Sequence, residues 1–98
     1  MVPIELHSAV YEEIENSRQW YDDVSTNLGN RFIQEVDRGM ERIRETPDTW
    51  PVYIPETRRF FLHRFPFAIV YKFDGEKARV FALMHLRRKP GYWADRLI

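Results

Sequence analysis

The chain has no cysteine among its 98 residues, so disulfides and thiolate metal sites are excluded. Its three histidines show neither HxH nor HxxxH spacing, which argues against a histidine metal site. No apolar run approaches the roughly 18 residues that a membrane-spanning helix needs. The N-terminus also lacks the basic segment and long apolar run of a signal peptide. These absences predict a cytoplasmic protein with no metal or other cofactor and no membrane partner.

Net charge is also absent, because 15 Lys and Arg balance 15 Asp and Glu. The balance conceals a division of the chain. Residues 1–50 carry five Arg and eleven acidic residues, whereas residues 51–98 carry ten basic and four acidic residues. A basic half can present a cationic face to nucleic acid even when the total charge is zero. Solvated acids on helices and solvated bases on strands account for the same division.

Apolar side chains, by contrast, are abundant. Hydrophobic residues make up 44% of the chain and aromatic residues 15%, so a packed core is expected. No internal repeat, low-complexity segment or long linker divides the sequence. The whole chain, residues 1–98, is therefore predicted to form a single domain.

Two helices are predicted in the first half, after a short strand at residues 4–7 with a period of two. The first helix is expected to begin with Ser8 as its N-cap and to end at Gly29. Asn30 then caps the second helix, which stops before Pro47 because the residue ahead of a proline avoids the α conformation. So short a connection predicts an antiparallel helical hairpin.

Helical periodicity divides the side chains of these helices into an inner and an outer set. The inner set is Val10, Ile14, Ser17, Tyr21, Val24 and Leu28, then Phe32, Val36, Met40 and Ile43, with Ile33 on the flank. Trp20, beside the first stripe, and Trp50 are also placed in the core. The acidic residues Glu12, Glu13, Asp22 and Asp23 are interpreted as a solvated face.

The second half indicates a loop over residues 47–55 and three strands, over residues 57–65, 67–73 and 77–85. Pro66 separates the first two because proline cannot donate to a strand ladder. Asp74-Gly75 is a typical hairpin turn. In the last strand, alternation places Val80, Ala82 and Met84 opposite Phe81, Leu83 and His85.

The predicted class is therefore α+β, with element order β-α-α-β-β-β. A helical hairpin packs on one face of a mainly antiparallel four-stranded sheet. Both faces of the strands are apolar, so the face away from the helices is expected to be covered by a partner or by a second copy of the chain.

The segment after the last strand combines a titratable ring with cations and aromatics. His85 suits proton transfer at neutral pH, although a ring that packs at the sheet end and bonds a backbone carbonyl is an equal alternative. Arg87, Arg88 and Lys89 suit contact with phosphate or with an acidic partner segment. Tyr92 can stack on a base or supply a phenol, and the following Trp93 is expected to close the core.

A second group of cations lies around the first strand of the second half. Arg58, Arg59 and Arg64 alternate with aromatic residues, an arrangement that can hold single-stranded RNA by stacking. The phenylalanines in this stretch are more often core residues. His63 is expected at the surface or facing a partner.

Two ordered sets of motifs span the chain. The first half contains Trp20-Tyr21, Leu28-Gly29-x-x-Phe32 and Ile43-x-x-x-Pro47-x-x-Trp50-Pro51. The second half contains Arg59-x-Phe61-x-x-x-Phe65-Pro66-Phe67-x-Ile69-x-Tyr71 and Val80-x-Ala82-x-x-His85-x-x-Arg88. Together these motifs resemble the RelE/ParE toxin superfamily, including its plasmid-stabilisation members. The resemblance covers nearly the whole chain. It implies the toxin half of a type II toxin–antitoxin pair, which inhibits growth and is neutralised by a cognate antitoxin.

The resemblance leaves the target open, because RelE-like members cleave mRNA in the ribosomal A site and ParE-like members poison DNA gyrase. A metal-free mRNA endoribonuclease implies catalytic roles for Arg59, His85, Arg88 and Tyr92. Target or nucleic-acid binding is implied for Arg58, Arg64, Arg87 and Lys89.

Two departures favour the alternative of a gyrase-binding poison, or of a decayed toxin that binds only its antitoxin. Ala68 stands where an mRNA-cleaving member often carries Arg, and Tyr92 is offset by a residue or two from the C-terminal Tyr. A homodimer and a heterotetramer with the antitoxin are both open as assemblies.

Overall fold

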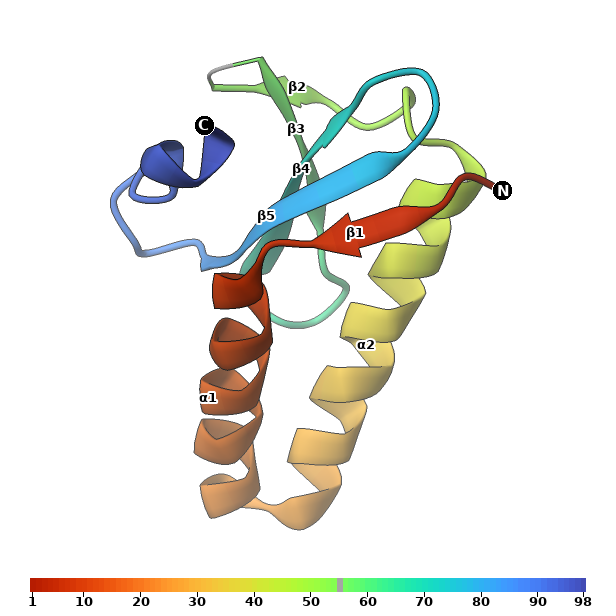
Figure 1. Ribbon diagram of the computed structural model, residues 1–98. Coiled ribbons are helices and arrows are strands. Elements are labelled where there is room, and N and C mark those ends of the chain that lie inside the picture. The colour runs from red at the N-terminus through yellow and green to blue at the C-terminus, as the bar shows by residue number, and fades with distance from the viewer. Residues whose placement is uncertain (55) are drawn as a thin grey trace.

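Over the described residues, five strands form one sheet and two long helices pack on one of its faces (Figure 1). The computed structural model describes residues 1–54 and 56–98. The elements are β1 (Ile4–Leu6), α1 (Ser8–Val24), α2 (Thr26–Glu45), β2 (Val52–Tyr53), β3 (Thr57–Phe61), β4 (Phe67–Phe73), β5 (Ala78–His85) and the 3₁₀ helix η1 (Ala94–Leu97). The predicted α+β class and helical hairpin are confirmed. The sheet gains a fifth strand, β2, inside the predicted loop, because Val52 and Tyr53 pair with the start of β3.

The strands lie in the order β1-β5-β4-β3-β2, with β1 parallel to β5 and the other pairs antiparallel. β1 pairs with β5 only from Ala78 to Val80. The chain then turns into α1, where His7 donates its backbone N–H to the Val80 carbonyl at 2.9 Å. The His7 Nδ1 accepts the N–H of Ala9 at 3.1 Å, so His7, and not the predicted Ser8, caps the helix.

The helices are joined at Ser25, whose extended backbone (φ −169°) separates α1 from α2. The predicted break at Gly29 is wrong, because Gly29 lies buried in the first turns of α2. A Cβ built at Gly29 meets the Asp22 Oδ1 at 1.6 Å, so glycine permits close approach of the two helices. Its role is packing, and the predicted cap at Asn30 is not needed.

The main core lies between the helices and the sheet. As predicted, α2 buries Phe32, Val36 and Ile43 against strands β4 and β5. Trp20 and Val24 are exceptions to the predicted core, since each is 63% exposed. The neighbouring Tyr21 takes the inward position instead, with its ring 5.1 Å from that of Phe32.

A β-bulge changes the phase of β5. Val70 pairs with Ala82, but the next residue, Tyr71, pairs with Val80, so Phe81 is an extra residue in the ladder. Val80 consequently faces the helices, while Ala82 and Met84 face the other side of the sheet. The predicted common face for Val80, Ala82 and Met84 is wrong at Val80.

The C-terminal segment of the chain itself covers part of the sheet face away from the helices. Trp93 is fully buried against Val70, Ala82 and Met84, and its indole N–H approaches the Met84 Sδ at 3.4 Å. The expectation that Trp93 closes the core is confirmed. No partner or second copy is required to bury these three side chains.

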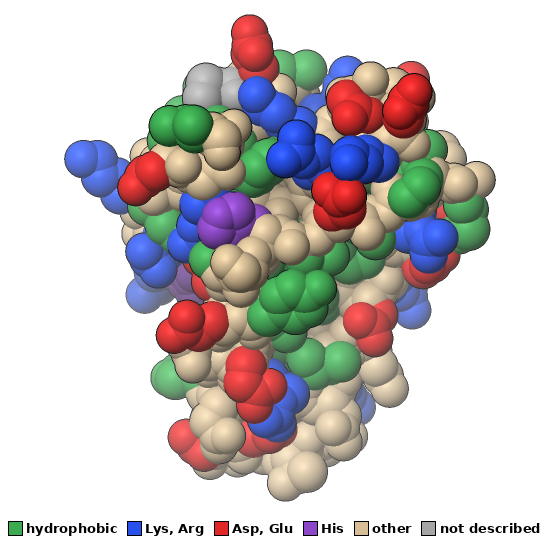
Figure 2. Space-filling view, in the orientation of Figure 1, with side chains coloured by type: hydrophobic (Ala, Val, Ile, Leu, Met, Phe, Trp, Pro, Cys, Tyr) green, Lys and Arg blue, Asp and Glu red, His purple; other side chains and the backbone are tan. Residues whose placement is uncertain are grey.

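Charge is distributed unevenly over the surface. In Figure 2 acidic side chains are spread over the helices, and several Lys and Arg side chains lie over the sheet. Part of this positive charge is paired, because Glu5 of β1 lies 3.0 Å from Lys77 and 3.9 Å from Arg79. None of the described helices is long and apolar enough to cross a membrane.

We predict that Gly39→Ala destabilises the fold. A Cβ at this buried position in α2 meets the Ile69 Cδ1 at 2.7 Å and the Phe60 Cε1 at 3.1 Å. Overpacking costs about 1–3 kcal/mol, whereas alanine gains about 1 kcal/mol of helix propensity over glycine. Urea unfolding should show a net loss, and Asp37→Ala at an exposed position of the same helix should not. A more stable Gly39→Ala protein contradicts this packing.

Candidate functional site

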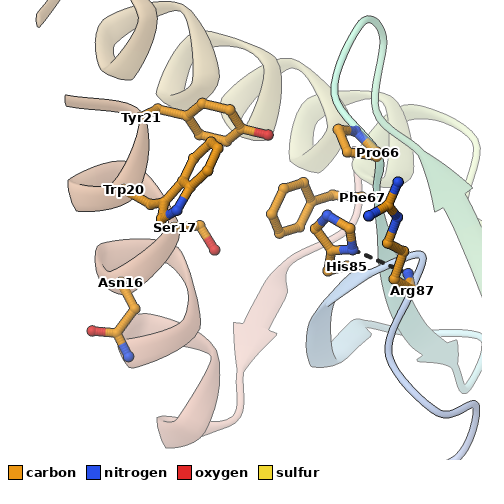
Figure 3. Close-up of a pocket in the computed structure, with 8 residues that line it drawn as sticks. All are labelled: Asn16, Ser17, Trp20, Tyr21, Pro66, Phe67, His85 and Arg87. Atoms are coloured by element: carbon orange, nitrogen blue, oxygen red, sulfur yellow. Dashed lines mark hydrogen bonds between the residues drawn. The ribbon is translucent and has the colours of Figure 1, made fainter. Parts of the chain in front are cut away.

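A groove of about 620 Å³ separates α1 from the ends of β4 and β5 (Figure 3). Its walls are Asn16, Ser17, Trp20 and Tyr21 from α1, and Pro66, Phe67, His85 and Arg87 from the sheet side. A smaller hollow of about 150 Å³ shares four of these residues and adds Glu13, Leu83, Arg88 and Tyr92. We call the two together the α1–sheet groove. Trp20, Tyr21 and Phe67 make part of it apolar, and Arg87 and Arg88 make its rim cationic.

His85 lies at the junction of the two hollows, at the end of β5. Its Nδ1 accepts the backbone N–H of Arg87 at 3.0 Å, and its ring meets that of Phe67 edge-on at 4.9 Å (Figure 3). The hydrogen bond requires an unprotonated Nδ1, so the neutral ring carries its proton on Nε2. The His85 ring thus packs at the sheet end, as one of its two predicted roles required. Its hydrogen-bond partner, however, is a backbone N–H and not the predicted backbone carbonyl.

Three exposed cations follow His85, and two of them line the rim of the groove. Arg87 lines the larger hollow, and Arg88 lines the smaller one. The Arg88 guanidinium lies 3.9 Å from the centroid of the Tyr92 ring, which restricts the side chain while leaving its donors available. Lys89 is exposed next to them in the sequence.

Tyr92 is held by a carboxylate. Its hydroxyl donates to the Glu13 Oε2 at 2.7 Å. Burial, with this hydrogen bond and the charge of Glu13, raises the pKa of Tyr92 well above its usual range. The phenol is therefore kept protonated and committed to Glu13, which does not suit the role of a base.

Glu13 joins four parts of the chain. Its Oε1 accepts the Leu83 N–H at 3.0 Å, and its Oε2 lies 3.0 Å from Arg96 as well as bonding Tyr92. Arg96 also donates to the Phe81 carbonyl at 3.0 Å. We call this set the Glu13 cluster. Only 16% of the Glu13 side chain is exposed, so its predicted place on a solvated face is wrong.

The sequence does contain a signal for Glu13. It stands three residues after the buried Val10 and four before Ser17, within the inner stripe of the helix. A carboxylate in that stripe must find donors, because a buried charge without partners is costly. The donors come from residues about 70 and 80 positions later, which helical periodicity cannot reveal.

Arg59 and Arg58 do not reach the groove. Arg59 pairs in register with Val70, whose side chain faces Trp93, whereas His85 pairs with Phe67, whose side chain faces the helices. The sheet therefore separates Arg59 from His85. The Arg59 guanidinium lies 3.8 Å from the centroid of the Tyr53 ring and 4.6 Å from that of Phe61. Arg58 donates to the Trp50 carbonyl at 2.8 Å.

Arg64 lies at a separate place. It is exposed in the loop between β3 and β4 and lines another hollow, beside α2. Of the eight candidate residues, the structure brings four to the α1–sheet groove, namely His85, Arg87, Arg88 and Tyr92.

Comparison with known proteins bears on the fold. No family model and no curated protein matches the chain by sequence. Among solved structures, the chain is similar to a chain of the chromosomal ParDE TA system from P. aeruginosa, with a TM-score of 0.77 and 12% sequence identity. The match covers 89% of this chain and 98% of that chain. The chain therefore has the RelE/ParE toxin fold that its ordered residues predicted.

We predict that Glu13→Ala lowers the free energy of unfolding by about 2–4 kcal/mol, because it leaves the Leu83 N–H, the Tyr92 hydroxyl and the Arg96 guanidinium without their acceptor. Glu13→Gln retains an acceptor oxygen and should lose less. Urea unfolding measures both, with Glu12→Ala as the exposed neighbouring control. Equal stabilities for Glu13→Ala and Glu12→Ala would show that the cluster does not stabilise the fold.

Tyr92 also predicts a pH dependence. The unfolded chain loses a tyrosine proton near pH 10, whereas the folded state retains it because the pKa of Tyr92 is raised. The folded state then binds more protons, so this contribution is complete below pH about 10 and is lost as pH rises further.

The urea midpoint of unfolding should accordingly decrease as pH rises above about 10. The midpoint of Tyr92→Phe should decrease less steeply with pH than that of the unmodified chain. Tyr11→Phe is the matched control, because Tyr11 is exposed. If the alkaline slope is the same in Tyr92→Phe as in the unmodified chain, the assignment to Tyr92 is wrong.

Proposed function

We propose that this protein is the toxin component of a type II toxin–antitoxin system of the RelE/ParE type. It arrests growth when produced alone and is neutralised by a cognate antitoxin. The observation that carries the proposal is the match over 89% of this chain to a chain of a ParDE TA system. The sequence resemblance, which runs through both helices and the strands, supports it independently.

We further propose that the toxin acts by contact and not by chemistry. The four candidate catalytic residues do not surround one phosphate, since Arg59 and His85 lie on opposite faces of the sheet. The Tyr92 hydroxyl is bound to Glu13. What the α1–sheet groove offers is a rim of exposed cations beside apolar walls, which suits a protein target such as gyrase.

The same groove is the proposed docking site for the antitoxin. Trp20 is 63% exposed at its wall, an unusual position for a large aromatic side chain in the absence of a partner. An antitoxin segment with apolar residues toward Trp20 and Phe67, and acidic residues toward Arg87 and Arg88, is complementary to it.

A ribosome-dependent mRNA endonuclease is the second candidate, and one observation favours it. His85, Arg88 and Tyr92 line a single small hollow. In that case Arg88 neutralises phosphate charge and His85 transfers a proton without any metal.

Two variants distinguish the candidates when the chain is expressed alone. His85→Asn keeps an acceptor for the Arg87 N–H but cannot transfer protons, so action by contact predicts continued growth arrest. Arg87→Ala with Arg88→Ala removes two rim cations and should relieve the arrest, because the contact loses its charge complementarity. Lys77→Ala with Arg79→Ala removes the same charge beside β1 and should not.

The cellular target is identified by assays on the same cells. DNA breaks with SOS induction support a gyrase poison, whereas ribosome-dependent mRNA cuts support the endonuclease. Loss of both mRNA cutting and growth arrest in His85→Asn would overturn action by contact. Normal growth of cells that express the unmodified chain without an antitoxin would contradict the toxin proposal itself.

A further inference from the structure

A second concave surface lies between α2 and the loop that joins β3 to β4. It consists of a hollow of about 510 Å³ and an adjoining one of about 350 Å³, which share Glu35, Arg38 and His63. Figure 1 shows the β3–β4 loop reaching from the sheet toward the two helices. None of the residues that line these two hollows lines the α1–sheet groove.

The surface is dominated by guanidinium groups. Arg31, Arg38 and Arg42 stand at positions i, i+7 and i+11 of α2, on one side of the helix. The loop adds His63 and Arg64. We call these five residues the α2 basic surface. Its three helix arginines lie in the acidic half of the chain, so counting charges by halves does not reveal them.

Acidic side chains neutralise only part of this charge. Glu35 lies 3.4 Å from Arg38, and Glu45 lies 4.0 Å from Arg42 at one end. Within residues 1–54 and 56–98, no salt bridge is formed by Arg31 or Arg64. The Arg38 side chain is 70% exposed despite its partner. The donors are thus available to a ligand.

The backbone at Arg64 is an independent sign of function. Arg64 adopts a φ of 69°, in the left-handed region where glycine or asparagine is usual. Holding another residue there is unfavourable, and such backbone strain is concentrated at functional sites. An exposed arginine at this position contributes charge to the hollow where a glycine would have relieved the strain.

We propose that the α2 basic surface binds the phosphate backbone of a nucleic-acid strand. Arg31 and Arg42 are eleven residues apart, about 16 Å along the helix at 1.5 Å per residue. That span is too long for one phosphate and suits several along a strand. A guanidinium group can donate two parallel hydrogen bonds to the oxygens of one phosphate, which favours this ligand.

A nucleic acid fits this surface better than a protein does. Protein interfaces have an apolar centre, whereas nucleic-acid interfaces are polar and strongly positive. The larger hollow holds three Arg, a His, a Gln and a Glu, with only Leu28 and Phe65 apolar. The adjoining hollow adds Arg42 together with Phe60, Phe61 and Leu62, and an exposed aromatic ring beside cations suits the stacking of a base in a single strand. The α1–sheet groove, with Trp20, Tyr21 and Phe67, has the opposite character. The inference therefore goes beyond the proposed function and does not depend on it.

Titration of the purified full chain with a short fluorescein-labelled single-stranded RNA, over a series of salt concentrations, tests the proposal. Anisotropy should report binding that weakens linearly on a log–log salt plot. Arg31→Ala with Arg64→Asn should weaken binding and reduce the magnitude of the slope by about 1.4, since each single-strand contact contributes about 0.7. Asn is used because it tolerates the φ of residue 64.

Matched variants locate the contact. Lys77→Ala with Arg79→Ala removes the same charge and should leave the slope unchanged. A parallel titration with duplex DNA shows whether the surface binds RNA or DNA. Binding of either nucleic acid supports the proposal if it is weaker in Arg31→Ala/Arg64→Asn. A thermal melt confirms that each variant is folded.

Three outcomes overturn the proposal. In the first, neither RNA nor DNA binds. In the second, binding depends on Arg87 and Arg88 and not on Arg31 and Arg64. In the third, a polyglutamate peptide binds in place of nucleic acid, which assigns the surface to an acidic protein. Growth arrest is not used as a readout, so failure here is distinct from failure of the proposed toxin function.

Discussion

The carboxylate of Glu13 completes a strand edge that the sheet itself leaves open. β1 covers β5 only as far as Val80, because the chain turns into α1 at His7. Beyond that point no strand among residues 1–54 and 56–98 lies next to the Leu83 N–H and the Phe81 carbonyl on this side. Unpaired edge groups are costly or prone to aggregation. Glu13 accepts from Leu83, and Arg96, paired with Glu13, donates to Phe81. One ion pair thus replaces a missing stretch of strand.

The positions of the C-terminal segment and of the candidate site depend on the same cluster. Tyr92 and Arg96 both bond Glu13, which fixes the segment on either side of Trp93. Trp93 in turn buries the face of the sheet that contains Ala82 and Met84. The cations that precede Tyr92 are consequently presented at the end of β5, next to α1, where they form the rim of the groove. The arrangement that closes the fold therefore also positions the proposed contact surface.

Local patterns in the sequence predicted the parts of this fold that depend on near neighbours. The inward stripe of α2 and the inward-packed Trp93 follow from periodicity and from the apolar character of the side chains. The phase of β5 did not follow, since the bulge at Phe81 is set by pairing with β4. Gly29 was misplaced because a glycine that permits close helix packing and one that ends a helix look alike in sequence. Three of the four proposed catalytic residues do line one hollow, but the sheet face of Arg59 and the long-range partner of Tyr92 depend on tertiary structure.

The central claim is that Glu13 supplies the missing partner of the β5 edge, and amide hydrogen exchange at Leu83 tests it most directly. If the claim holds, the Leu83 amide in the unmodified chain exchanges as slowly as the ladder-bonded amides of β4. In Glu13→Gln, which keeps an acceptor, protection should persist in part, and in Glu13→Ala it should be lost while the β4 amides stay protected. A Leu83 amide that exchanges as fast as an exposed loop amide in the unmodified chain would contradict the account.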